Sequence, residues 1–217
     1  MKKITTLVLA TILSAITTFA NAEWSAGITG TGVSMDASAK EDGKTKADVT
    51  RDETLEAMFG SIFLEYNFGP ASVGLDVMPY TFETEKVTNV RTDDNEDSAS
   101  NDNGTTTAHL EVDYNTMLYV LAPLGDAGVY AKVGASFADV TSVESTATST
   151  SYPDDELIGG HISLGYQANM QDGIFVRAEV GYSEYDDLSG TSSSQRTKVQ
   201  INNLSGEHAR ISIGKAF

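Results

Sequence analysis

Apolar and polar residues alternate with a period of two along most of this chain, and this feature limits most strongly how it can fold. In residues 58–68 the even positions are mostly apolar, whereas the odd positions include Ser61, Glu65 and Asn67. Successive side chains of a β-strand point to opposite faces, so the pattern predicts strands with one apolar and one polar face. We count eight such segments, approximately residues 24–34, 58–68, 72–77, 108–120, 129–137, 158–167, 174–183 and 207–217.

The connections between these segments alternate strictly between short and long. The short ones hold Gly69-Pro70-Ala71, residues 122–127 and residues 169–173, which have the composition of turns. Short turns at one end and long loops at the other are typical of an up-and-down barrel that spans an outer membrane. The long connections are rich in Ser, Thr, Asp and Asn and cover approximately residues 35–56, 84–105, 139–156 and 186–206.

A sheet with an apolar face has to close on itself when lipid surrounds it. The hydrocarbon core offers no partner to backbone N–H and C=O groups, so an open sheet edge is not stable there. A tilted strand of about 9 to 11 residues is long enough to cross a bilayer. We therefore predict an all-β fold, an eight-stranded antiparallel up-and-down transmembrane β-barrel in which the first strand pairs with the last.

The start of the chain predicts a signal peptide. Lys2 and Lys3 precede an uncharged, mostly apolar run, and Ala20-Asn21-Ala22 supplies a cleavage site of the small-x-small type. The expected domains are a cleaved signal peptide over residues 1–22 and an outer-membrane barrel over residues 23–217. The expected destination is the cell outer membrane, reached by export through the periplasm.

The composition excludes some partners. The chain has 14 Lys and Arg against 31 Asp and Glu, a net charge of −17. Nucleic-acid binding needs clustered basic residues to neutralise phosphates, so no nucleic-acid partner is expected. The chain has no cysteine, so its stability must come from packing and hydrogen bonding rather than disulfides. No cofactor is expected.

Residues of the polar parity should face the barrel interior. In residues 108–120 the even, apolar positions should face lipid, whereas His109, Glu111 and Asp113 should face inward. An eight-stranded barrel is just wide enough for its own side chains, and an unpaired buried charge is costly. We therefore expect a network of paired charges that fills the lumen, with a proton or small-ion path as the alternative. Its members are Glu65, Asp76, His109, Glu111, Asp113, Lys132, His161, Arg177, Glu179, His208 and Arg210.

One group of residues has the composition of a hydrolase site. His161 and Ser163 share a strand face, and Glu179 on the next strand should lie roughly opposite Ser163. These are the side-chain types of a base, a nucleophile and an orienting carboxylate. The set also resembles the His-x-Ser plus Glu residues of outer-membrane lipid A deacylases. All three have inward parity, whereas an enzyme that acts on lipid should present them to the bilayer, so we predict no catalysis.

Acidic clusters in two predicted loops are the remaining candidates for binding. Residues 93–97 with Asp102, and residues 154–156, gather many carboxylates. Hard cations prefer such oxygen ligands, but the spacing matches no ordered calcium loop. We predict no metal site and interpret these clusters as solvated loop tips. Weak divalent-cation bridging between the loops and lipopolysaccharide phosphates stays as a hypothesis.

The combined pattern resembles the small outer-membrane β-barrels related to the OmpA transmembrane domain and to the opacity-type, porin-like surface proteins. The signal-peptide ending, the strand and turn rhythm and the closing residues 209–217 carry the resemblance. Members of that family typically end in an aromatic residue with alternating apolar residues upstream, which the outer-membrane assembly machinery reads. Phe217, Ile213 and Ile211 match this assembly signal, and Lys215 departs from it.

The resemblance implies a range of functions. Family members include membrane-integrity proteins, adhesins and narrow pores. The expected function is therefore a structural or surface-interaction role, namely membrane integrity or loop-mediated adhesion. A small porin or ion-conducting barrel is the alternative, and a lipid A-modifying barrel is the less favoured one. The expected partners are outer-membrane lipid, lipopolysaccharide and the assembly machinery, with the protein acting as a monomer, and the loops carry no motif that names a further partner.

Overall fold

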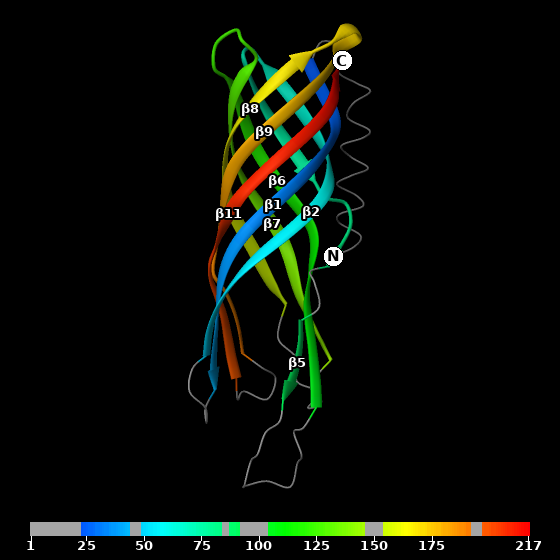
Figure 1. Cartoon of the computed structure of the whole chain (residues 1–217). Coiled ribbons are helices and arrows are strands. Elements are labelled where there is room, and N and C mark those ends of the chain that lie inside the picture. Colours follow the sequence, from blue (N-terminus) through cyan, green and yellow to red (C-terminus); the bar gives the residue numbers. More distant parts are fainter. Residues whose placement is uncertain (1–22, 44–48, 84–86, 92–103, 146–153, 192–196) are drawn as a thin grey trace, which may run out of the picture.

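The computed structural model describes residues 23–43, 49–83, 87–91, 104–145, 154–191 and 197–217. The expected signal peptide and the acidic run at 93–102 lie outside this part of the chain. Eight strands form a ring (Figure 1), and they are β1 (Glu23–Gly43), β2 (Val49–Phe68), β3 (Ala71–Val77), β6 (Gly104–Pro123), β7 (Val129–Ser145), β8 (Asp155–Asn169), β9 (Ile174–Tyr185) and β11 (Thr197–Ala216).

Three shorter strands and one 3-10 helix complete the described structure. The helix η1 (Gln171–Gly173) lies in the turn between β8 and β9. The short strands are β4 (Phe82–Glu83) and β5 (Val87–Arg91), which pair with β6, and β10 (Leu188–Thr191), which pairs with β11. None of the helices among the described residues is long and apolar enough to cross a membrane.

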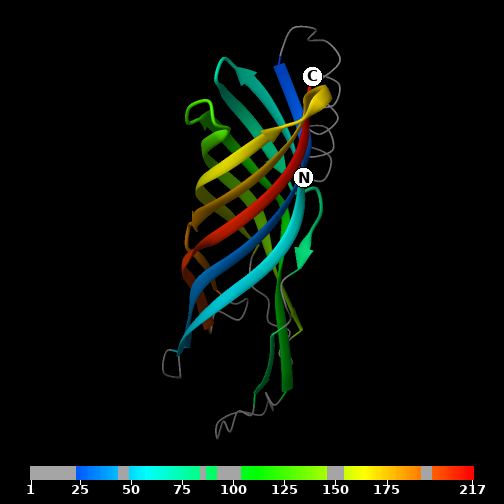
Figure 2. The ribbon, with the colours of Figure 1, turned by 45° about the horizontal axis from the view of Figure 1, so that its top comes forward.

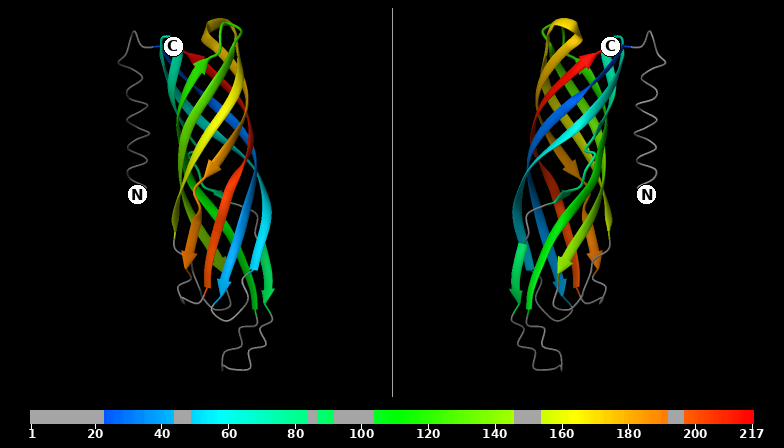
Figure 3. Two further views of the ribbon diagram at one scale, coloured as in Figure 1. Left: turned by 90° about the vertical axis from the view of Figure 1, so that its left-hand side faces the viewer. Right: turned by 90° about the vertical axis from the view of Figure 1, so that its right-hand side faces the viewer.

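The ring closes between the first and the last strand. β1 pairs antiparallel with β11 from Ser25 opposite Ala216 to Gly43 opposite Thr197. The backbone N–H of Phe217 then donates to the carbonyl oxygen of Trp24 over 2.8 Å, so hydrogen bonding reaches the last residue. The two strands lie side by side in every view (Figures 1 and 3). The predicted eight-stranded antiparallel barrel is confirmed.

The two ends of the barrel differ as the connection lengths predicted. The three short turns, the start of β1 and the end of β11 gather at one end, here called the turn end, which is at the top of Figures 1 and 2. The opposite, loop end differs from the prediction, because β1, β2, β6, β7 and β11 continue far into segments that were expected to be loops. These extensions lack strict alternation, since an outer strand face beyond the lipid does not need apolar residues.

The two faces of the wall are also as the alternation predicted over most of the barrel. Large apolar residues point outward and are exposed, for example Leu118 at 53%, Val133 at 58% and Ile162 at 64%. Polar residues of the opposite parity are buried inside, for example Glu65 at 0% and Ser136 at 1%. The outer face therefore matches hydrocarbon, and the inner face matches a sealed polar core.

A β-bulge in β6 corrects part of this assignment. Asp113 lies opposite Asp139 and Thr116 lies opposite Phe137, so Tyr114 and Asn115 together face one residue of β7. One extra residue reverses which face each following side chain occupies. On the loop-end side of the bulge, Val112 pairs with the buried Val140 and faces inward. His109, Glu111 and Asp113, which were expected inside, therefore lie on the outer face.

The wall is interrupted where β3 ends. Among the residues that the structure describes, β2 pairs with β3 over Ile62–Phe68, and the rest of β2 pairs with β1 alone. In the described part of the chain, β4 and β5 pair with β6 and not with β2. Residues 78–81 separate β3 from β4, and Pro79 among them has no N–H to donate. The Gly60 N–H, beyond the last β2–β3 pair, donates to the Tyr80 hydroxyl over 2.6 Å, so a side chain replaces a missing strand.

Candidate functional site

Six charged side chains meet inside the turn-end half of the barrel, and we call them the charged plug. They are Glu65, Asp76, Lys132, Arg177, Glu179 and Arg210, all of which are buried. Glu65 and Arg177 form a two-pronged pair, with Nη1–Oε1 at 2.5 Å and Nη2–Oε2 at 2.8 Å. Such parallel hydrogen bonds fix both the distance and the orientation of the two groups. This pair joins β2 to β9 across the lumen.

The other four members join the remaining strands. Lys132 Nζ donates to both oxygens of Glu179, over 3.0 and 2.8 Å. Arg210 pairs with Asp76, and its Nε lies 4.0 Å from Glu179 Oε1. The plug therefore holds three acidic and three basic groups in contact, so burial leaves no net charge uncompensated. That balance is what a poorly hydrated interior requires.

Two tyrosines complete the plug, and the alternation of polar and apolar residues alone does not predict them as members. The Tyr119 hydroxyl donates to Glu65 over 2.7 Å, and the Tyr130 hydroxyl donates to Glu179 over 3.0 Å. Each ring lies over a glycine of the neighbouring strand, since a Cβ at Gly74 would stand 2.3 Å from the Tyr119 ring and one at Gly165 would stand 2.3 Å from the Tyr130 ring. An inward glycine directly opposite an inward tyrosine is the sequence pattern that indicates such a ring contact inside the barrel.

A histidine layer lies next to the plug on its loop-end side. His161 Nδ1 hydrogen-bonds to Ser183 Oγ over 2.8 Å, and its Nε2 hydrogen-bonds to Ser136 Oγ over 2.7 Å. Ser183 Oγ also hydrogen-bonds to His208 Nδ1 over 2.9 Å. Both histidines therefore belong to a chain of hydrogen bonds with serine hydroxyls around the inner wall.

The hydrolase-like set does not assemble. His161, Ser163 and Glu179 all lie on the inner face, but both nitrogens of His161 are occupied by Ser136 and Ser183. The Glu179 carboxylate is bound by Lys132 and Tyr130 instead of orienting a histidine. His161, Ser163 and Glu179 are therefore not linked in the order that acyl transfer needs.

Beyond the histidines, the inner face becomes apolar, which is unusual for an outer-membrane barrel. We call these residues the apolar inner layer. Phe59 and Phe82 are part of it and meet across the wall interruption with ring centroids 6.5 Å apart. The inward parity set by the strand registers identifies its members as Val33, Met35, Ala37, Ala57, Phe59, Phe82, Val112, Ala138, Val140, Leu157, Leu188 and Leu204.

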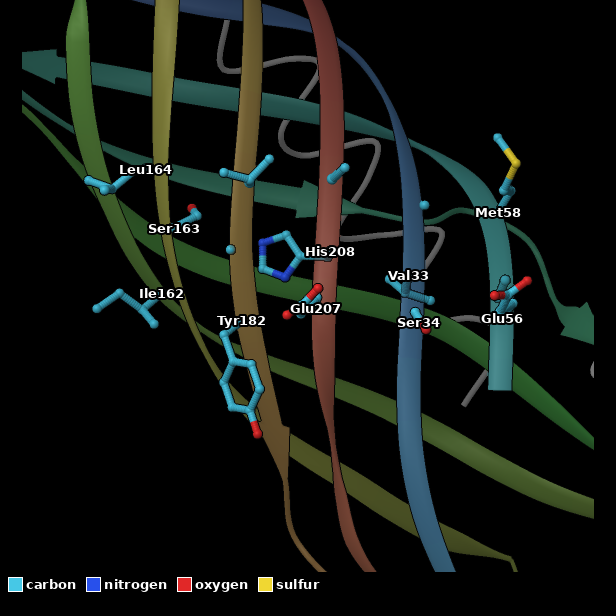
Figure 4. A pocket seen from close by; sticks show the side chains of 15 residues that line it. Val33, Ser34, Glu56, Met58, Ile162, Ser163, Leu164, Tyr182, Glu207 and His208 are labelled. Carbon is cyan, nitrogen blue, oxygen red and sulfur yellow. The ribbon is translucent and has the colours of Figure 1, made fainter. Parts of the chain in front are cut away.

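One hollow lies on the outer wall of the barrel, and another opens into the lumen at the turn end. A groove of about 1000 Å³ crosses the outer wall, where apolar side chains such as Met58 and Ile162 border small residues of β1 and β11 (Figure 4). The carboxylates of Glu56 and Glu207 also line it. A second hollow of about 520 Å³ opens at the turn end below Arg177. Between this opening and the histidines, the charged plug fills the lumen.

The other predicted residues lie at the surface. Ile211 and Ile213 face outward at 69% and 49% exposure, and Phe217 is 67% exposed at the turn end. Residues 154–156 are exposed. No group of three His, Cys, Asp or Glu side chains in the described ranges is arranged to hold a metal ion. Outside the barrel interior, these residues form no site.

The comparisons with known proteins agree with this architecture. The sequence profile described as "Outer membrane protein beta-barrel domain" matches residues 6–204. No curated protein sequence gives a significant match. The outer membrane protein OprG from Pseudomonas aeruginosa is similar in structure with a TM-score of 0.51 and 14% identity, covering 90% of this chain and 96% of that chain. The outer membrane protease OmpT from Escherichia coli has a TM-score of 0.50 and 7% identity, covering 90% and 97%.

At such low identity these similarities concern the fold alone. One of the two related structures is a protease, so the fold by itself does not decide between an enzyme and a barrel without catalysis. The family match covers most of the chain and confirms the resemblance to small outer-membrane barrels. This chain belongs to the outer membrane protein beta-barrel domain family and is an outer-membrane β-barrel protein.

Proposed function

We propose that this protein is a non-catalytic barrel that admits small apolar molecules from the cell exterior and releases them sideways into the outer membrane. The observation that carries the proposal is the interrupted wall between β2 and β4, which lies beside the apolar inner layer. An apolar molecule that enters from the loop end meets apolar side chains first. Its shortest way out is through the side of the barrel.

The charged plug favours this side exit over a route through the lumen. A solute that moved on toward the turn end would have to separate Glu65 from Arg177 and Lys132 from Glu179. Parting buried ion pairs costs several kcal/mol for each ion. The β2 edge, by contrast, is bridged by a hydrogen bond of Gly60 to the Tyr80 hydroxyl, over 2.6 Å, and by the contact of the Phe59 and Phe82 rings. The lower barrier is therefore lateral.

The level of the interruption also fits release into lipid. The interruption is bordered by Ile62, Met58 and Val77, whose side chains face outward. Ile62 is 37% exposed and Met58 is 84% exposed. The row of Asp113, Asp139 and Glu156 marks where the outer face becomes polar. The interruption therefore starts within the apolar band and continues beyond it.

The test is the entry of an apolar fluorescent dye into intact Gram-negative cells, whose lipopolysaccharide leaflet slows such molecules. Cells that carry the protein should take up the dye faster than cells that lack it. Ala57→Trp fills the inner layer beside the interruption and should reduce uptake to the rate of cells without the protein. Ala135→Trp makes the same change on the outer face and should leave uptake unchanged. Equal uptake by the parent and by a folded Ala57→Trp barrel would refute the proposal.

A further inference from the structure

Three buried polar atoms that make no hydrogen bond belong to residues that line one small cavity inside the barrel. They are Thr31 Oγ1, Ser61 Oγ and Arg210 Nε, none of which has a hydrogen-bond partner in the described structure. Their residues are 5%, 6% and 8% exposed. The cavity has a volume of about 40 Å³. Buried polar groups are nearly always hydrogen-bonded, so three at one place indicate an occupant.

The cavity lies between the charged plug and the apolar inner layer, at the level of His161 and His208, which also line it. Along the inner face of β1, Thr31 is followed by Val33, and along the inner face of β2, Ser61 is followed by Phe59 in the same direction. Val33, Phe59 and the buried Met78 also line the cavity. Its occupant therefore meets hydrogen-bonding groups at one end and apolar groups toward the loop end.

We infer that this cavity binds the oxygen-bearing end of a small amphipathic molecule whose apolar part lies along the apolar inner layer. The inference rests on the proposed function, because it defines which molecules the inner layer receives. Two hydroxyls and one guanidinium N–H converge on the cavity, and all three can donate to an oxygen. A space of this size holds on the order of three water-sized groups, so the oxygen-bearing end enters and the rest of a longer molecule lies outside.

The charge of the surroundings selects among oxygen groups. Asp76 lines the same cavity as Arg210, and the two are already paired. The plug is balanced, so a bound carboxylate would add a negative charge that no free cation of the plug compensates. An uncharged hydroxyl or carbonyl oxygen satisfies the three donors without that cost. The ligand class is therefore alcohols and ketones rather than fatty-acid anions.

The test uses the full barrel in lipid nanodiscs with ¹³C-methyl methionine, because Met78 and Met117 line the cavity. Hexan-1-ol, hexane and hexanoate are titrated separately, and the two methyl signals are followed. Hexan-1-ol should shift both signals and should bind roughly five-fold tighter than hexane, which is the usual effect of about one buried hydrogen bond. Hexanoate should bind more weakly than the alcohol.

Variants connect this preference to the named groups. Thr31→Val combined with Ser61→Ala should remove the preference for the alcohol and leave hexane binding unchanged. Ser212→Ala is the control, because Ser212 is an interior hydroxyl that bonds to Thr29 and does not line the cavity. Equal binding of hexan-1-ol and hexane to the parent would overturn the inference, since water would then fill the cavity. Tighter binding of hexanoate would also overturn it. If none of the three shifts either signal, the proposed function itself fails.

Discussion

The Glu65–Arg177 pair shows how a single contact holds the barrel interior together. Glu65 is fully buried and also accepts a hydrogen bond from Tyr119, so Glu65→Gln leaves the Arg177 charge without its counter-ion. Breaking one partner of a buried pair costs about 3–5 kcal/mol. We expect the free energy of unfolding, measured with urea in lipid vesicles, to fall by this amount. Adding Arg177→Met should recover part of the loss, and a double variant less stable than Glu65→Gln alone would contradict this account.

Ser163 offers a second prediction at the scale of single residues. It is buried, and neither nitrogen of His161 bonds to it. Ser163→Ala should therefore leave the acylation of lipid A unchanged when the masses of extracted lipid A are compared with and without the variant. A change in acylation that follows this hydroxyl would restore the enzyme interpretation.

Most interior charges could be predicted from parity, but their partners could not. Glu65 and Arg177 are separated by 112 residues and meet only because the ring places β2 and β9 on facing walls. Alternation predicts whether a side chain faces inward or outward. It does not predict the position of that side chain along the barrel axis or which side chain it meets across the lumen. Tyr119 and Tyr130 had a signal in the glycines opposite them, Gly74 and Gly165, which becomes readable once the strand order is known.

The sequence predicts most of the strands correctly, but it does not predict the irregularities within them. The strands within the bilayer and their three turns were predictable, because lipid imposes alternation and turns require Gly, Pro and Asp. The bulge at Tyr114 was not, since Tyr114 adopts a positive φ of 50°, which a bulky residue rarely does. Pro79 was a usable signal for the interrupted ladder, because proline donates no hydrogen bond to a neighbouring strand.

The bulge in β6 gives a prediction for a whole strand. Asn115 is the extra residue of the bulge, so its deletion leaves Tyr114 alone opposite Ala138 in a regular ladder and keeps Glu111 and Asp113 on the outer face. The deletion variant should therefore refold in vesicles like the parent, on a gel that separates folded from unfolded barrels. Tyr114→Val keeps the residue count but disfavours the positive φ of the bulge. Without the bulge, Glu111 and Asp113 would turn inward, and burying a carboxylate without a partner costs several kcal/mol, so the refolded fraction should fall sharply. Equal refolding of Tyr114→Val would show that the bulge does not set the faces of β6.

For the molecule as a whole, the balanced plug predicts that the barrel does not conduct ions. Lys132, Arg177 and Arg210 are each paired inside the narrowest interior, so the purified barrel in a planar bilayer should show no steady ion conductance. Replacing both Glu65 and Arg177 by alanine removes two large side chains and should produce measurable openings. A steady open state of the parent would return the small-porin alternative to first place.

Some strands of the ring are paired over fewer residues than others, and this determines which strand should separate from its neighbours first. β3 is held by β2 over Ile62–Phe68 and by β6 over Ser72–Val77, whereas β1 is held along nearly its whole length on both sides. Local opening needs the least energy where the fewest backbone bonds must break. Amide protons of β3 should therefore exchange with deuterium before those of β1, and the barrel should separate along this strand when it is heated or pulled apart.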